Sequence, residues 1–163
     1  MLRRVATLLL MLSITPFGFA SMARAAGNSY YFTGKEFLEG LSPGAVSVNV
    51  QESYLPFVQA GGGNPKLAKL PEGTGGLALL CYVQSAGGKF KSGNGYLPIS
   101  GAPVEIIGGG LKLAARADEH GYVVLALPPG QYEVRLPGFS RKVKLEKGKN
   151  ALVAIRGGKR MVD

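Results

Sequence analysis

Short segments of alternating apolar and polar residues, separated by turns, constrain the fold of this chain most strongly between residues 99 and 138. The stretch reads ISGAPVEIIGGGLKLAARADEHGYVVLALPPGQYEVRLPG. In Asp118-Glu-His-Gly121, the glycine suits the positive φ of a longer hairpin loop. Pro128-Pro129-Gly130 forces a sharp exit from one strand, because proline cannot donate to a strand ladder. This arrangement predicts a small antiparallel β-sandwich.

Seven strands are predicted from residue 77 onward. Within one of them, Tyr132, Val134 and Leu136 alternate with charged residues, the pattern of a strand with one face in the core. Seven strands in about 80 residues favour a sandwich, although a closed barrel is also compatible with this spacing. The predicted strands span residues 77–84, 104–107, 111–117, 122–127, 131–136, 140–145 and 151–156.

Residues 26–76 are predicted to be an N-terminal extension that packs on the sandwich or reaches a partner. Residues 35–41 are predicted to form a short helix, because Thr33 and Glu36 have the spacing of a capping box. Residues 45–50 alternate in the manner of a strand. The predicted fold class is therefore an all-β, seven-stranded antiparallel sandwich with a short N-terminal helix and extension.

Residues 1–25 have the features of a secretory signal peptide. Two arginines precede an apolar run over residues 5–14, and Ala23-Arg24-Ala25 supplies the small residues of a cleavage site. Cleavage is expected after Ala25, with the Ala20 region as an alternative. The run is short for a membrane anchor, which needs about 20 apolar residues, although an uncleaved anchor is the competing interpretation. The predicted division is a signal peptide at 1–25, the extension at 26–76 and the sandwich at 77–163.

The chain is basic, with 19 Lys and Arg against 10 Asp and Glu. Without the leader, 16 basic residues would face the same 10 acidic ones, a net charge of about +6. Such an excess suits an acidic protein, an acidic polysaccharide or lipid headgroups, and a solvated strand face is the alternative. Nucleic acid is not expected for an exported chain without a recognition motif. The basic residues near the end are Arg135, Arg141, Lys142, Lys144, Lys147, Lys149, Arg156, Lys159 and Arg160.

Residues 77–156 resemble the carboxypeptidase regulatory-like family of transthyretin-like, immunoglobulin-like sandwiches. The resemblance rests on two segments, Pro98-Ile-Ser-Gly-Ala-Pro-Val104 and Asp118-Glu-His-Gly-Tyr-Val-Val-Leu-Ala-Leu-Pro-Pro-Gly-Gln-Tyr-Glu-Val134. It implies a reused accessory module, generally without catalytic activity. A longer Gly- and Lys-rich loop over residues 85–97 departs from the family pattern, and residues 27–76 lie outside it.

The residue types that common hydrolytic and metal sites need are scarce. His120 is the only histidine, which excludes a zinc peptidase site built from two histidines. Cys81, the only cysteine, lies in an apolar run and is expected to be buried and inert, with a reactive thiol or an intermolecular bridge as alternatives. Asp118, Glu119 and His120 are expected to form a solvated turn, with a weak metal contact as the alternative. We expect no enzyme activity, no cofactor and no metal.

The expected function is that of an exported, non-catalytic binding module in the periplasm or at the cell surface. It would bind another envelope or extracellular protein, including an acidic one, or assist assembly, and no membrane span is expected after leader cleavage. The alternative is a carbohydrate-binding module with Phe90 and Tyr96 as stacking platforms. The aromatic residues 30–32 are expected either to pack in the core or at a sheet edge, or to contact a partner. The candidate partner-binding residues are Tyr30, Tyr31, Phe32, Phe90, Tyr96, Arg141, Lys142 and Lys144.

Overall fold

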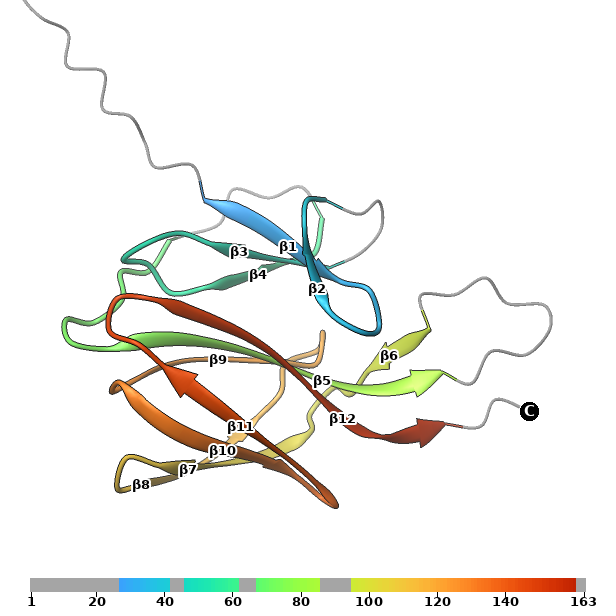
Figure 1. The fold of residues 1–163 in the computed structure, drawn as a ribbon. Helices are drawn as coiled ribbons and strands as arrows, with labels where there is room; N and C mark the ends of the chain where they lie inside the picture. Colours follow the sequence, from blue (N-terminus) through green and yellow to red (C-terminus); the bar gives the residue numbers. More distant parts are fainter. Residues whose placement is uncertain (1–26, 42–45, 62–66, 86–94, 161–163) are drawn as a thin grey trace, which may run out of the picture.

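The computed structural model describes residues 27–41, 46–61, 67–85 and 95–160, and in this part of the chain the fold is all-β, as predicted. Its strands form three layers, which we call the N-terminal sheet, the central sheet and the outer sheet (Figure 1). The predicted signal peptide lies outside the described residues. Within them, no helix has the length and hydropathy to cross a membrane.

The central sheet is covered on both faces, and strand β5 (Gly75–Ser85) shows why its sequence is almost continuously apolar. Leu77, Leu79 and Cys81 pack in the core shared with the outer sheet. Ala78 and Leu80, which alternate with them, pack in a second core shared with the N-terminal sheet. A strand buried on both faces has no solvent side and therefore shows no polar alternation. The neighbours of β5 in this sheet are β6 (Tyr96–Pro98), β9 (Tyr122–Leu127) and β12 (Asn150–Arg160).

The outer sheet has the order β11-β10-β7-β8, and its inner face closes the first core. Tyr132, Val134 and Leu136 of β10 all point into that core, as their alternation predicted. Each of the seven segments predicted to be strands is a strand, to within a few residues at its ends. The strands of this sheet are β7 (Pro103–Gly108), β8 (Leu111–Arg116), β10 (Gly130–Leu136) and β11 (Phe139–Leu145).

One strand pairing departs from the antiparallel prediction. Strands β5 and β12 are parallel, with Ala151 opposite Leu77 and Ile155 opposite Cys81. Because β11 belongs to the outer sheet and β12 to the central one, the turn at residues 146–149 carries the chain from one layer to the other. The chain enters the central sheet there in the same direction as β5. Local hairpin signals cannot reveal such a change of sheet.

The predicted N-terminal helix is wrong, because residues 35–41 contain strand β2 (Phe37–Glu39) of a hairpin. The N–H of Thr33 donates to the Glu36 carbonyl at 2.9 Å, and Gly34 has a φ of 94°, which closes a tight turn. The Glu36 N–H does donate to Thr33 Oγ1 at 3.3 Å, so the bond expected of a capping box forms within a turn. A helix this short is unstable alone, whereas the hairpin gains a pairing partner.

The N-terminal sheet has the order β2-β1-β3-β4 and lies against the central sheet (Figure 1). Its remaining strands are β1 (Asn28–Phe32), β3 (Ser47–Val50) and β4 (Phe57–Gln59). Phe32 is 1% exposed, and its ring centroid lies 4.8 Å from that of Tyr82 and 4.9 Å from that of Tyr96. The extension thus packs as a third layer on the central sheet, one of the two arrangements expected for it.

Candidate functional site

One face of the outer sheet is not covered by any described element (Figure 1). It collects charged side chains from four strands. On β10, Glu133 and Arg135 alternate with the buried core residues and so point away from the core. The strand register places Lys142 and Ile107 on either side of Glu133, and Glu105 beside Arg135. We call this surface the outer face. Its residues are Glu105, Ile107, Lys112, Ala114, Arg116, Gln131, Glu133, Arg135, Ser140, Lys142 and Lys144.

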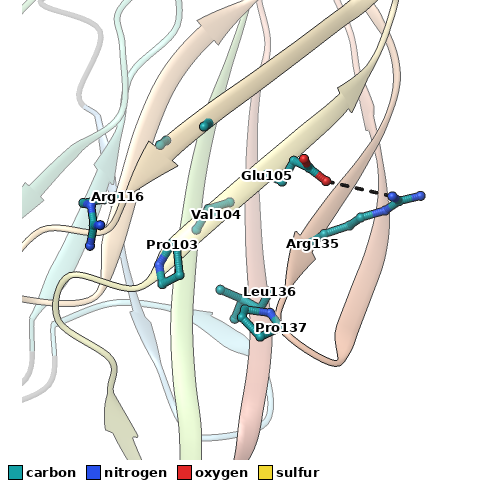
Figure 2. Close-up of a pocket in the computed structure, with 9 residues that line it drawn as sticks. Pro103, Val104, Glu105, Arg116, Arg135, Leu136 and Pro137 are labelled. Atoms are coloured by element: carbon teal, nitrogen blue, oxygen red, sulfur yellow. Dashed lines mark ion pairs between the residues drawn. The ribbon is translucent and has the colours of Figure 1, made fainter.

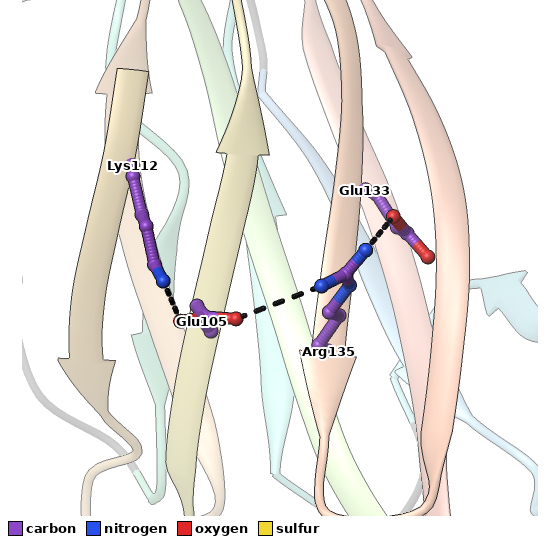
Figure 3. A network of polar contacts seen from close by, with 4 residues as sticks. All are labelled: Glu105, Lys112, Glu133 and Arg135. Atoms are coloured by element: carbon purple, nitrogen blue, oxygen red, sulfur yellow. Dashed lines mark hydrogen bonds and ion pairs between the residues drawn. The ribbon is translucent and has the colours of Figure 1, made fainter.

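A chain of alternating charges crosses three strands of the outer face (Figure 3). Lys112 Nζ lies 2.9 Å from Glu105 Oε1, and Arg135 Nη1 lies 3.9 Å from Glu105 Oε2. Arg135 Nη2 donates to Glu133 Oε2 at 2.6 Å. The hydrogen bond from Arg135 lowers the pKa of Glu133, and the same bond raises the pKa of Arg135. Since these groups are exposed, the network mainly orients the side chains and adds little stability.

The outer face carries more cations than its own carboxylates can pair. Five basic side chains, on β8, β10 and β11, share it with two acidic ones, Glu105 and Glu133. Lys144 lies 3.3 Å from Glu146 in the adjoining turn, where Lys149 Nζ also lies 2.6 Å from Glu146. Arg116 donates to the Gly101 carbonyl at 3.3 Å and makes no ion pair within the described residues. The surplus leaves the outer face able to attract an acidic partner.

The three basic residues predicted on β11 divide between two locations. Lys142 and Lys144 are exposed on the outer face, as the alternation of β11 requires. Arg141 directly precedes Lys142 in sequence, and its Nη1 donates to the main-chain oxygen of Ala154 at 2.6 Å. That bond joins β11 to β12 where the chain has changed sheets. Arg141 is therefore a structural link between two layers.

An open notch of about 600 Å³ lies at one end of the outer face (Figure 2). Its walls come from the start of β7, the end of β8 and the end of β10. Arg116 and Arg135 lie on opposite sides of β7, and the Glu105 carboxylate pairs with Arg135. Small apolar side chains and two prolines supply the remaining surface. The lining residues are Pro103, Val104, Glu105, Ala114, Ala115, Arg116, Arg135, Leu136 and Pro137.

The aromatic candidates do not form one binding surface. Tyr30 and Tyr31 are half-buried on β1, whereas Phe32 is buried between the N-terminal sheet and the central sheet. Tyr96 is half-buried and packs edge-on against Phe32 and Tyr82, with a T-shaped ring geometry to both. Burial raises the pKa of Tyr96. Phe90 lies outside the described residues. Packing within the fold therefore accounts for Phe32 and for much of the Tyr96 ring.

The residues considered for reactivity or metal binding have structural roles instead. Cys81 is fully buried, and desolvation, with a smaller contribution from Asp118, raises its thiol pKa to about 12. One oxygen of Asp118 accepts the main-chain N–H groups of His120 at 2.9 Å and Tyr122 at 2.8 Å. Asp118 thus closes the predicted hairpin turn. Within the described ranges, no cluster of three or more His, Cys, Asp and Glu side chains could hold a metal ion.

Sequence reasoning did not single out Arg116 or the notch. The alternation of β8 and β10 puts Arg116 and Arg135 on the solvent side of their own strands. Their placement on either side of β7 depends on the strand order β10-β7-β8, which is not sequential. A local pattern could therefore have flagged each arginine as exposed, but not their relation to one another.

No protein-family model matches this chain, and a search of the curated proteins found no match to its sequence. The functional argument therefore rests on the fold and on the outer face.

Proposed function

We propose that this protein is an exported, non-catalytic β-sandwich module that binds an acidic protein of the cell envelope or extracellular space. The leader features at residues 1–25 support export. The observation that carries the binding role is the surplus of cations on the uncovered outer face. Charge complementarity of this kind accelerates encounter and favours partners of opposite sign.

The layering of the sheets also supports a binding role for the outer face. The central sheet is buried on both faces, so side chains on those faces are not available to a macromolecule. The outer face, in contrast, combines a notch of apolar and charged side chains with ion pairs that hold Glu105, Glu133 and Arg135 in place. Preorganised side chains lose less freedom on binding than free ones do.

The proposal includes membership of residues 77–156 in the carboxypeptidase regulatory-like group of sandwiches. Two structural details support it. Asp118 closes the hairpin turn through its carboxylate, and the Tyr132 hydroxyl donates to the Pro128 carbonyl at 2.7 Å. The second contact resembles the tyrosine corner of immunoglobulin-like sandwiches, in which a tyrosine at the start of a strand bonds back to the preceding corner. The seven strands predicted from residue 77 onward would form this unit.

Capture of a partner by crosslinking tests the binding role. The purified protein would be mixed with native envelope and culture supernatant, and crosslinked species identified at low and high salt. We expect one dominant partner whose yield falls at high salt, because salt screens exposed charges beyond about 10 Å at 0.1 M. Reversing two outer-face charges with Lys142→Glu/Lys144→Glu should reduce capture.

The matched control reverses two exposed lysines far from the outer face, Lys35→Glu/Lys69→Glu, with the same change in net charge. It should capture the partner like the unmodified protein. If both double variants lost capture equally, net charge alone, and not the outer face, would account for the effect. Absence of any protein partner would contradict the proposal and favour a polysaccharide ligand.

Export has its own test. The N-terminus of the protein recovered from the periplasm or the medium should be Ala26, which intact mass spectrometry would show. Recovery of the full-length chain only in a membrane fraction would support the uncleaved-anchor interpretation instead.

A further inference from the structure

The notch of the outer face exists because two neighbouring strands separate at its base. Strands β7 and β10 pair from Gly108 opposite Tyr132 as far as Glu105 opposite Arg135, and no further. Pro137 follows directly after β10 and has no N–H to extend the ladder. Beyond Arg135 the chain turns into β11 through Pro137 and Gly138, away from β7. The resulting opening is bordered by Pro103 and Val104 on one side and by Leu136 and Pro137 on the other.

Its chemistry combines apolar contact with two separate guanidinium groups (Figure 2). Arg116 is exposed on β8 opposite Pro103, and Arg135 projects from β10 beside Glu105. Arg135 is already held by two carboxylates, whereas Arg116 donates to the neutral Gly101 carbonyl and pairs with no carboxylate among the described residues. An incoming carboxylate therefore gains most at Arg116, where a bidentate pair can form without displacing an existing ion pair.

The position of Glu105 restricts what else can bind. Its carboxylate lines the notch, so a uniformly anionic chain laid across all three strands would meet repulsion at the middle one. A segment that presents one acidic and one apolar side chain on the same face avoids that contact. In an extended segment these two residues are two positions apart, because neighbouring side chains point to opposite faces. The acidic side chain would face Arg116 while the apolar one rests on the surface formed by Pro103, Ala114 and Pro137.

We propose that this notch binds an extended segment of the partner protein that carries an acidic and an apolar residue two positions apart, with the carboxylate paired to Arg116. This inference rests on the proposed binding function and names the site and the chemistry of the partner. Arg116 and Ala114 are specificity residues: the first selects charge, and the second leaves room for an apolar side chain.

Fluorescence polarisation with short labelled peptides tests the proposal. The probe is a peptide about six residues long, which matches one strand. It carries leucine and glutamate two positions apart, with serine at the other positions, and we call it the leucine–glutamate peptide. An all-glutamate peptide and a leucine–lysine peptide, in which lysine replaces the glutamate, serve as comparisons. The purified protein should bind the leucine–glutamate peptide at least about tenfold more tightly than either comparison, since only that peptide satisfies both charge and apolar contact.

Two variants distinguish the two contributions. Arg116→Glu should weaken binding of the leucine–glutamate peptide by about tenfold or more, because a carboxylate then faces a carboxylate. Ala114→Phe should fill the notch and weaken the same peptide by a similar factor while leaving the weak all-glutamate binding unchanged. Both residues are exposed, so neither change disturbs the core. Lys35→Glu, remote from the notch, should alter affinity by less than about twofold.

The outcomes separate this site from the broader function. Equal affinity for the leucine–glutamate and leucine–lysine peptides, or equal behaviour of Arg116→Glu and Lys35→Glu, would overturn the proposal. If the crosslinked partner is still captured by Arg116→Glu at the unmodified level, the notch is not its site, although the binding function stands. If no partner is captured by any form, the proposed function itself fails.

Discussion

The side chain of Asn150 is bonded to the main chain of Gln51. Its Nδ2 donates to the Gln51 carbonyl at 3.1 Å and to the Tyr54 carbonyl at 3.0 Å. Asn150 begins β12 in the central sheet, whereas Gln51 and Tyr54 belong to the connection between β3 and β4. One amide group thus joins two layers whose residues are almost 100 positions apart. These two hydrogen bonds add to the apolar packing that holds the N-terminal sheet on the central sheet.

Removing this amide should lower stability measurably. Asn150→Ala loses two hydrogen bonds to main-chain carbonyls, and we expect a loss of roughly 1–3 kcal/mol in the free energy of unfolding. Asn150→Asp should cost more, because a carboxylate would then face two carbonyl oxygens. Urea denaturation followed by circular dichroism measures both changes. Lys147→Ala, exposed in the neighbouring turn, is the control and should stay within about 0.5 kcal/mol.

A second prediction concerns the close approach of Gly76 to Asn150. A Cβ built on Gly76 would lie 1.9 Å from Asn150 Oδ1 and 2.9 Å from Pro56 Cδ. Gly76→Ala should therefore destabilise the protein by about 1–3 kcal/mol through overpacking. Gly130→Ala is the matched control, since its Cβ would meet nothing closer than 3.8 Å. In a double-mutant cycle, Gly76→Ala and Asn150→Ala should be less than additive, and strict additivity would show that the two residues do not interact.

The tyrosine corner yields a third prediction. Tyr132→Phe removes only the hydroxyl that donates to the Pro128 carbonyl, and the ring remains in the core. We expect a loss of about 1–2 kcal/mol, because the carbonyl loses its partner. Tyr31→Phe, at a half-buried position on β1, should cost no more than about 0.5 kcal/mol. Similar unfolding midpoints for both variants would argue against a contribution from the corner.

Because its thiol is buried, Cys81 should make the folded protein less stable as the pH becomes alkaline. Burial raises the pKa of Cys81 from 9.0 to about 12, so the folded protein keeps this proton where an unfolded chain releases it. The stabilisation that the protonated Cys81 thiol contributes is fully present below pH 9, and it is lost as the pH rises toward the pKa of the thiol in the folded protein. Between about pH 9 and about pH 10 the free energy of unfolding should fall by roughly 1 kcal/mol.

Cys81→Ala provides the control for the thiol. It removes the titrating group, so its stability should change less across the same interval, which urea denaturation at each pH would reveal. A thiol-reactive dye gives an independent measurement. The unmodified protein should react with it only when urea has exposed the buried Cys81 side chain. Rapid labelling of the folded protein at neutral pH would contradict the assignment of an inert thiol.

Of the strands from residue 77 onward, all except β6 could be predicted, because each has a local cause, whereas β6 begins within the long loop predicted over residues 85–97. Alternation marked the β10 core residues Tyr132 and Val134, and glycine marked the turn at Gly121, where φ is 80°. The helix predicted at residues 35–41 failed because its apolar residues do not share one buried face. Phe37 joins the aromatic packing around Phe32, whereas Leu41 is 76% exposed. In so short a segment, pairing with β1 outweighs intrinsic helix preference.

The candidate site was predictable only in part. The charges of Lys142 and Lys144 and their solvent exposure follow from the alternation of β11. Arg141 has the same charge and lies in the same run, yet its contact with Ala154 depends on a strand that has changed sheets. Strands adjacent in space are not adjacent in sequence here, so the network from Lys112 to Glu133 could not be read from the chain.

By itself, the amino-acid sequence determined the all-β class, the positions of most strands from residue 77 onward and the excess of positive charge. These properties follow from side-chain period, turn residues and composition, all of which are local. Only the tertiary structure decided that β5 is shared by two cores, that β12 runs parallel to it, and that Arg116 and Arg135 flank one notch. Those features depend on which strands become neighbours, and neighbours are chosen by the burial of whole faces rather than by any single segment.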